Sequence, residues 1–187
     1  MLKPLKVAAL AITLLGSFFA VTSLAEELKL KVLLKVADFP IVDSDRDLEY
    51  FLRNPSRFKN SAKTGASGAQ LEEVLNRLVV ETMIFEENKV VGNVELGAAD
   101  GLALLKNIKA SFGSQWREFL LVFDQDENSI KERLLKRALV DKVIQKKIEA
   151  VLKLSNSSKE NSEAVAQKTV EDWLKQLRGR YRVQVFE

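Results

Sequence analysis

The stretch FDQDENSIKERLLKRALVDKVIQKKI, residues 123–148, contains most of the longest predicted helix and indicates a mainly helical fold. Its acidic start interrupts the apolar pattern, and Asn128 or Ser129 can cap the helix that follows. The apolar residues of that helix are Ile130, Leu134, Ala138, Leu139, Val143, Ile144, Ile148 and Val151. They cover more than one face, so the sequence predicts a long helix, ending near Leu154, that contacts neighbours on two sides.

Apolar residues at helical spacing recur on both sides of this stretch. The chain before it predicts a helix from about Asp43 that Asn54-Pro55 stops, a second over residues 70–88, and a third capped by Asn93 and running to about Ser111. A short helix opens at Ser114, and a final one spans residues 163–178, with Gly179 just after its end. Residues 56–68 and 155–162 are polar and predict a loop and a connector.

Alternating patterns flank the helical region. Residues 26–42 read as extended, with a turn at 37–40 and a short return strand at Ile41 and Val42, and residues 181–186 alternate again. Because an isolated strand leaves its backbone groups unpaired, we expect the C-terminal strand to pair with the N-terminal one. The predicted fold is mainly α, a multi-helix domain with a small β element that joins the two terminal strands.

The first 25 residues predict an export signal. Lys3 and Lys6 precede an almost unbroken apolar run over residues 7–21, and Ser23-Leu24-Ala25 fits a signal-peptidase site. The run is shorter than the roughly 20 residues of a membrane span. We expect cleavage near Ala25, a soluble domain over residues 26–187 in the periplasm, and no stable membrane insertion after cleavage. An uncleaved leader that anchors the protein is the alternative.

The chain contains no histidine and no cysteine. This composition disfavours most hydrolases, redox enzymes, disulfide frameworks and metal sites, so we expect no enzyme activity, no catalytic residue, no cofactor and no metal. Asp43, Asp45 and Asp47 alternate like a calcium loop, but the glycine and glutamate that such a loop requires are missing, and helix capping is the better interpretation. The formal charge of +3 falls to about +1 without the leader, which does not favour nucleic acid as a partner.

The long helix carries an excess of lysine and arginine over acidic residues. A solvated helix face is the simplest interpretation. Contact with anionic lipid headgroups or with acidic client segments is the alternative.

Four stretches resemble the N-terminal domain of SurA-like periplasmic chaperones, relatives in fold of the client-binding region of trigger factor. They are VLLKVADFPIVDSDRDLEYFL from Val32, QLEEVLNRLVVETMIFEENKVV from Gln70, the long helix with the short helix before it, and VEDWLKQLRGRYRVQVF from Val170. The resemblance implies an ATP-independent chaperone core that takes part in protein folding and outer-membrane protein assembly. In that family, parvulin-type isomerase domains are inserted at the junction that here is only residues 155–162, and their sites typically use histidine. Prolyl-isomerase activity is therefore not expected.

The resemblance leads to one function and one alternative. The first is a holdase that binds unfolded or nascent envelope proteins through exposed apolar surfaces. The alternative is a non-catalytic scaffold or assembly subunit for one dedicated envelope partner, formed as a dimer that exchanges strands or helices. The candidate client-facing residues are Phe51, Phe58, Met83, Trp116, Phe119 and Phe123. Their spacing fits core positions equally well, so burial in the fold is the competing interpretation.

Overall fold

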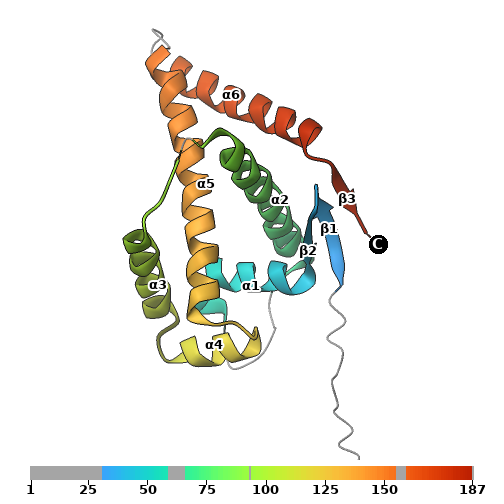
Figure 1. Cartoon of the computed structure of the whole chain (residues 1–187), viewed down its shortest axis with the longest axis vertical. Coiled ribbons are helices and arrows are strands. Elements are labelled where there is room, and N and C mark those ends of the chain that lie inside the picture. The colour runs from blue at the N-terminus through green and yellow to red at the C-terminus, as the bar shows by residue number, and fades with distance from the viewer. Residues whose placement is uncertain (1–30, 59–65, 93, 155–158, 187) are drawn as a thin grey trace, which may run out of the picture.

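The computed structural model describes residues 31–58, 66–92, 94–154 and 159–186 (Figure 1). The leader predicted for residues 1–25 and the first residues of the predicted N-terminal strand lie outside this part of the chain. The described strands are β1 (Val32–Val36), β2 (Phe39–Val42) and β3 (Val183–Val185). The described helices are α1 (Asp43–Arg53), α2 (Gly68–Val91), α3 (Ala98–Phe112), α4 (Trp116–Val122), α5 (Glu127–Leu154) and α6 (Lys159–Arg180), with short 3₁₀ turns at Pro55–Arg57 and Gly113–Gln115. The predicted class, mainly α with a small β element, is confirmed.

The sheet joins the two ends of the described chain. Its strand order is β2-β1-β3, and both neighbouring pairs are antiparallel. Leu34 lies opposite Ile41 on one side and Val185 on the other. The expected pairing of the N-terminal and C-terminal strands is therefore confirmed.

The turn between β1 and β2 is tighter than the predicted 37–40. Ala37 has a positive φ of 51°, so the chain reverses over Ala37 and Asp38 alone. Phe39 and Pro40 already belong to β2. Proline is tolerated there because β2 is an edge strand and one side of its backbone needs no ladder hydrogen bond.

Helix α5 runs along the length of the molecule and organises the other helices (Figure 1). It contacts α2, α3 and α6, as its apolar residues on more than one face predicted. Helices α5 and α6 are close together at the top of the view and diverge downwards, and the C-terminal end of α2 lies between them. Helix α6 then leads directly into β3.

Side-chain caps fix the starts of α1 and α2. Asp45 accepts a hydrogen bond from the Val42 backbone N–H through Oδ2 at 3.3 Å, so the aspartates cap α1, although not in the predicted Ser44–Asp47 pairing. Ser67 and Gln70 cap α2 reciprocally: Ser67 Oγ accepts from Gln70 N at 3.3 Å, and Gln70 Oε1 accepts from Ser67 N at 3.0 Å. These hydrogen bonds fix the residues at which α1 and α2 begin.

Three predicted helix boundaries are wrong. Helix α5 starts at Glu127, so neither Asn128 nor Ser129 caps it, and Asp126 Oδ1 accepts a hydrogen bond from the Ser129 N–H at 2.7 Å instead. Helix α3 starts at Ala98 rather than near Asn93, because the Gly97 N–H donates to Asp100 Oδ2 at 2.8 Å and closes the first turn there. Helix α6 starts at Lys159, not at residue 163, and continues through Gly179 to Arg180. The connector predicted for residues 155–162 is therefore shorter, and residues 155–158 lie outside the described chain.

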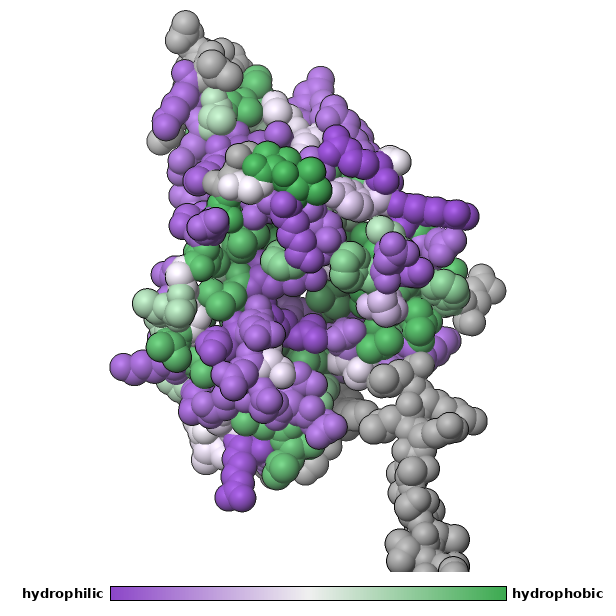
Figure 2. Space-filling view, in the orientation of Figure 1, coloured by the Kyte–Doolittle hydropathy of each residue, from purple (hydrophilic) through white to green (hydrophobic). Residues whose placement is uncertain are grey.

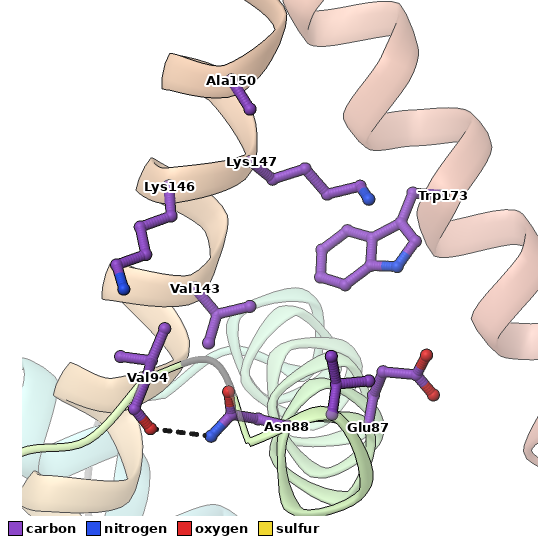
Figure 3. A pocket seen from close by; sticks show the side chains of 9 residues that line it. Glu87, Asn88, Val94, Val143, Lys146, Lys147, Ala150 and Trp173 are labelled. Carbon is purple, nitrogen blue, oxygen red and sulfur yellow. Dashed lines mark hydrogen bonds between the residues drawn. The ribbon is translucent and has the colours of Figure 1, made fainter.

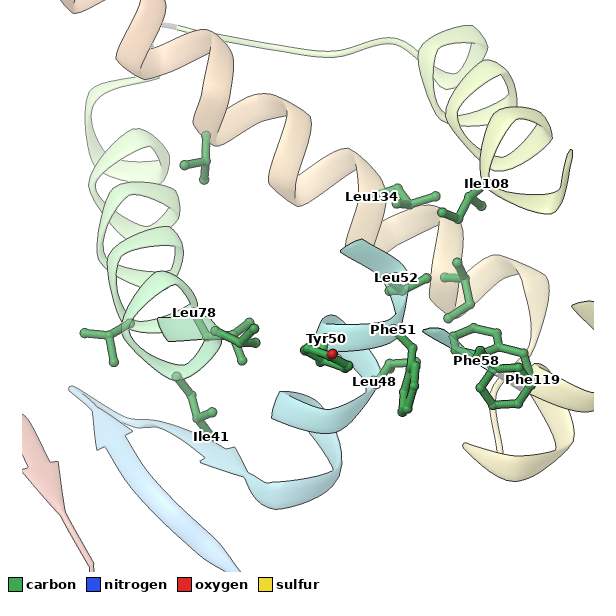
Figure 4. Packing of buried hydrophobic residues seen from close by; sticks show 14 of the residues in the cluster. Ile41, Leu48, Tyr50, Phe51, Leu52, Phe58, Leu78, Ile108, Phe119 and Leu134 are labelled. Atoms are coloured by element: carbon green, nitrogen blue, oxygen red, sulfur yellow. The ribbon is translucent and has the colours of Figure 1, made fainter. Parts of the chain in front are cut away.

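The core is continuous but has two parts, with α1 between them (Figure 4). Towards the sheet and α2 it is mostly aliphatic, with Ile41, Leu48 and Leu78. Towards α3 and α4 it is aromatic, and the rings of Phe58 and Phe119 lie 5.4 Å apart, edge to face. Because α1 supplies side chains to both parts, it couples the sheet side of the domain to the helical side.

Candidate functional site

The aromatic residues predicted to face a client lie in the core instead. Phe51, Phe58, Met83, Trp116 and Phe119 are all buried, with Met83 and Phe119 at 0 % exposure, and Phe123 is half-buried against the same cluster. A buried side chain cannot contact a client in this structure. The five buried residues therefore belong to the core, which was the competing interpretation of their spacing, and Phe123 packs at its margin.

Contacts within the fold explain this burial. The Phe119 ring lies 4.3 Å from Phe112 and 5.2 Å from Phe123, centroid to centroid. Trp116 donates its indole N–H to Glu127 Oε1 at 3.0 Å, so its polar atom is also satisfied inside the fold. The hydrogen bond from Lys109, and then that from Trp116, lower the pKa of Glu127 below its usual range.

Apolar side chains reach the surface instead at a notch between the C-terminal end of α2 and the facing sides of α5 and α6 (Figure 3). The notch has a volume of about 470 Å³. Its lining residues are Glu87, Asn88, Val91, Val94, Val143, Lys146, Lys147, Ala150 and Trp173. Three separate helices therefore build it, with apolar groups on its walls and charged groups among them.

Trp173 gives the notch its largest apolar surface. It projects from α6 towards α5, and the ammonium of Lys147 lies 4.8 Å from its ring centroid (Figure 3). On the α2 side, Val91 is 50 % exposed, and its neighbour Val90 is 82 % exposed. Figure 2 shows this apolar surface as a green area at the C-terminal end of α2, surrounded by polar side chains. The Trp173 ring offers a partner an apolar contact, and the lysine ammonium beside it offers a positive charge for an anionic group.

Polar contacts hold the α2 end in place. Gly92 adopts the left-handed conformation at φ 65° that ends α2, and the buried Asn88 side chain donates to the Val94 carbonyl at 3.0 Å. Glu87 accepts a hydrogen bond from Arg180 at 2.5 Å and from the Tyr181 hydroxyl at 3.2 Å. Burial, and then the bond to Glu87, raise the pKa of Tyr181. The same contacts that build one wall of the notch therefore also fix the junction of α6 with β3.

A smaller groove of about 330 Å³ lies nearer the shared end of α5 and α6. Ile148 and Leu152 of α5 face Ala166 and Val170 of α6 there. With 100° between successive helical residues, Ile148 and Leu152 lie on the other side of α5 from Val143 and Ala150. The groove is therefore separate from the notch.

A third cavity, of about 570 Å³, is lined by α1, α2, α5 and α6, and two of its lining residues, Arg53 and Glu81, belong to an ionic cluster. Glu49 is 2 % exposed, and Arg53 Nε lies 2.8 Å from its Oε1 as an ion pair whose angle is too poor for a hydrogen bond. Arg137 Nη1 lies 3.3 Å from the same oxygen, and Arg53 also pairs with Glu81. Burial is the main reason that the pKa of Glu81 is raised, and Arg53 partly offsets it. Both carboxylates are thus paired, as in a structural cluster.

Two other kinds of site are absent from the described residues. Residues 31–58, 66–92, 94–154 and 159–186 include no group of three acidic side chains placed to hold a metal ion. In this same part of the chain, none of the helices combines the length and the apolar character needed to cross a membrane.

Comparison with known proteins gives no relative: no family model matches the chain, and no curated protein is significantly similar to it. The choice of the candidate site therefore depends on the geometry of this structure alone. The sequence analysis missed Trp173, because it fits the apolar stripe of its helix, and Val91, because it lies beyond residue 88, where the helix was predicted to end. The pair Val90-Val91 could have indicated this site, because two branched apolar residues stand directly before a glycine that ends the helix. Both are exposed in the structure.

Proposed function

We propose that this protein is an exported, ATP-independent chaperone of the periplasm that holds unfolded envelope proteins without prolyl-isomerase activity, in the manner of the SurA-like proteins it resembles. The observation that supports this proposal is the open apolar notch built by α2, α5 and α6. A holdase needs an apolar surface that is accessible in the folded state and tolerant of many sequences. The notch offers Trp173 and Val91 in this way.

The expected affinity is low and the binding reversible. Burial of one large apolar side chain contributes about 1.5–3 kcal/mol, and association costs at least about 4 kcal/mol. A notch that accepts a few client side chains therefore holds a client only weakly. Weak binding suits a compartment without ATP, because the client can leave when its own folding buries the same side chains.

The proposal is tested by suppression of client aggregation. Several unrelated outer-membrane β-barrel proteins are diluted from urea with the full chain at near-stoichiometric ratio, and light scattering is followed. We expect delayed aggregation of each client and no acceleration of prolyl isomerisation in a peptide assay. If the protein delays the aggregation of none of these clients, a holdase function is refuted. Protection of one client alone, with tight binding, supports the alternative of a dedicated scaffold subunit.

A matched pair of variants tests the notch itself. Val91→Glu places a charge on the notch wall, and Leu102→Glu places the same charge on α3, outside the residues that line the notch. The two side chains are 50 % and 61 % exposed, so neither change disturbs the core. Only Val91→Glu should weaken protection, and equal protection by both variants excludes the notch as the client site. Fluorescence of the half-buried Trp173 gives an independent reading of occupancy in a Trp116→Phe background.

A further inference from the structure

The sheet has an open edge along β3. In the strand order β2-β1-β3, β3 pairs with β1 on one side, and no other described strand lies on its second side. Its bonds to β1 come from alternate residues: Arg182 O accepts from Ala37 N at 2.9 Å, and Phe186 N donates to Leu33 O at 3.0 Å. In an antiparallel pair, the residues between these point their N–H and C=O groups the other way. Val183 and Val185 therefore present unpaired backbone groups to the outside.

The side chains of the same two residues are also uncovered. The register places Val185 opposite Leu34 and Val183 opposite Val36, so all four lie on one face of the sheet. The helices bury Leu34 and Val36 to 5 % and 0 % exposure, whereas Val183 and Val185 remain 37 % and 75 % exposed. The apolar face of the sheet thus extends one strand beyond its helical cover. An additional strand would satisfy the backbone and cover the valines at the same time.

We infer that the β3 edge binds an extended client segment as a fourth strand, in which apolar residues alternate with polar and acidic ones. The alternation follows from the pleat, since every second side chain of the added strand lies beside Val183 and Val185. The acidic preference follows from charge: Arg182, directly before β3, is exposed, whereas Arg180 at the end of α6 is already paired with Glu87. Period-2 alternation of apolar and polar residues is also the pattern of outer-membrane barrel strands.

A second copy of the chain fits this edge less well than a client. β3 has three residues, so self-pairing across it would bury far less than the roughly 1,200–2,000 Å² of a stable interface. Shortness and flanking charge are the features by which proteins prevent edge-to-edge association. A flexible client does not need that area, because it is held only transiently. This inference rests on the proposed chaperone function and names the conformation of the client that the edge would take.

The test uses a fluorescein-labelled ten-residue peptide in which valine alternates with threonine and glutamate. Its binding to the full chain is measured by fluorescence anisotropy, beside two forms that are N-methylated either at every valine or at every polar residue. Strand pairing uses the N–H groups of one set only, so one methylated form should lose binding and the other should keep it. Equal binding of the two forms overturns the inference, because a contact made by side chains alone does not distinguish them.

Two changes at Val185 test the protein side. Val185→Pro removes an outward N–H that makes no bond to β1, and Val185→Glu repels the acidic peptide without depending on backbone geometry. Val185→Pro should weaken binding about tenfold, the scale of one lost hydrogen bond with its desolvated partner, and Val185→Glu should weaken it through charge repulsion. Leu121→Glu is the matched control, since Leu121 on α4 is 74 % exposed against 75 % for Val185. Unchanged binding by Val185→Glu, or a dimer in sedimentation that this variant dissociates, overturns the inference.

The notch variant separates the two proposals. Val91→Glu should leave peptide binding at the edge intact. If the peptide does not bind while Val91-dependent protection of clients persists, the edge inference fails alone. If the peptide binds but no client is protected from aggregation, the chaperone proposal fails and strand addition at the edge stands.

Discussion

Replacement of Phe119 by alanine should separate a core role from a client-binding role. Phe119 is 0 % exposed, and its ring contacts those of Phe58, Phe112, Trp116 and Phe123 at centroid distances of 4.3 to 5.7 Å. Truncation of a buried phenylalanine to alanine costs about 3–5 kcal/mol, from lost transfer energy and the cavity left behind. The rings around Phe119 are held by several elements and have little freedom to collapse. We therefore expect a value near the upper end of that range.

Urea unfolding followed by far-UV circular dichroism measures this loss as a free energy of unfolding. A domain of this size has about 5–15 kcal/mol of stability, so the variant should remain folded in dilute buffer but unfold at a much lower urea concentration. The control is Leu121→Ala, two residues further along α4, where the side chain is 74 % exposed and the expected change is within about 0.5 kcal/mol. A cost below about 1 kcal/mol for Phe119→Ala, together with lost protection of clients, would refute the core assignment.

Four further changes test the packing and the electrostatics. Gly101→Ala should lower the melting temperature despite a gain of about 1 kcal/mol in helix propensity, because the new Cβ would lie 2.8 Å from Leu135 Cδ1. Gly179→Ala should raise the melting temperature, because no atom lies within 4 Å of its new Cβ. Glu81→Gln should stabilise the protein at pH 7. Because the pKa of Glu81 is raised in the folded state, its protonated form favours folding, and this stability is lost as pH rises through the folded pKa. The gain in the free energy of unfolding should therefore shrink when urea titrations are repeated at acid pH. Glu127→Gln should destabilise the protein at pH 7. The pKa of Glu127 is lowered in the folded state, so its charge gives stability that is present above the unfolded pKa and lost as pH falls through the folded pKa. A destabilisation that persists at acid pH would contradict this.

The sequence predicted the elements of the fold better than their ends. Apolar periodicity located the helices and both terminal strands because burial of one face is a property of each segment alone. Helix ends depend on contacts elsewhere. Helix α6 continues through Gly179 since Arg180 bonds to Glu87 and the Tyr181 N–H reaches Leu177 O at 2.8 Å. No local pattern reveals that Glu87, at the end of α2, is available for this contact.

The candidate site was harder to predict than the fold. An apolar residue at helical spacing is buried or exposed according to whether another element covers it, and sequence periodicity does not distinguish the two. Phe119 is covered by Phe112 of α3 and by Phe58, whereas Val91 at the C-terminal end of α2 is 50 % exposed. The residues with the largest rings were the natural candidates for a client surface. In this fold they are the residues that other elements cover most completely.

The central position of β1 in the sheet has a consequence for the order of folding. β1 pairs with β2 within a few residues, but its other partner, β3, lies about 150 residues later, the kind of separation that slows folding. During synthesis the ribosome releases β1 long before β3 exists, so the early hairpin has an open side until the last segment arrives. Sheet completion is therefore a late event in folding, because the central strand waits for a partner from the other end of the described chain. Pairing of β3 with β1 would be the step that joins the two ends of the described chain and closes the domain.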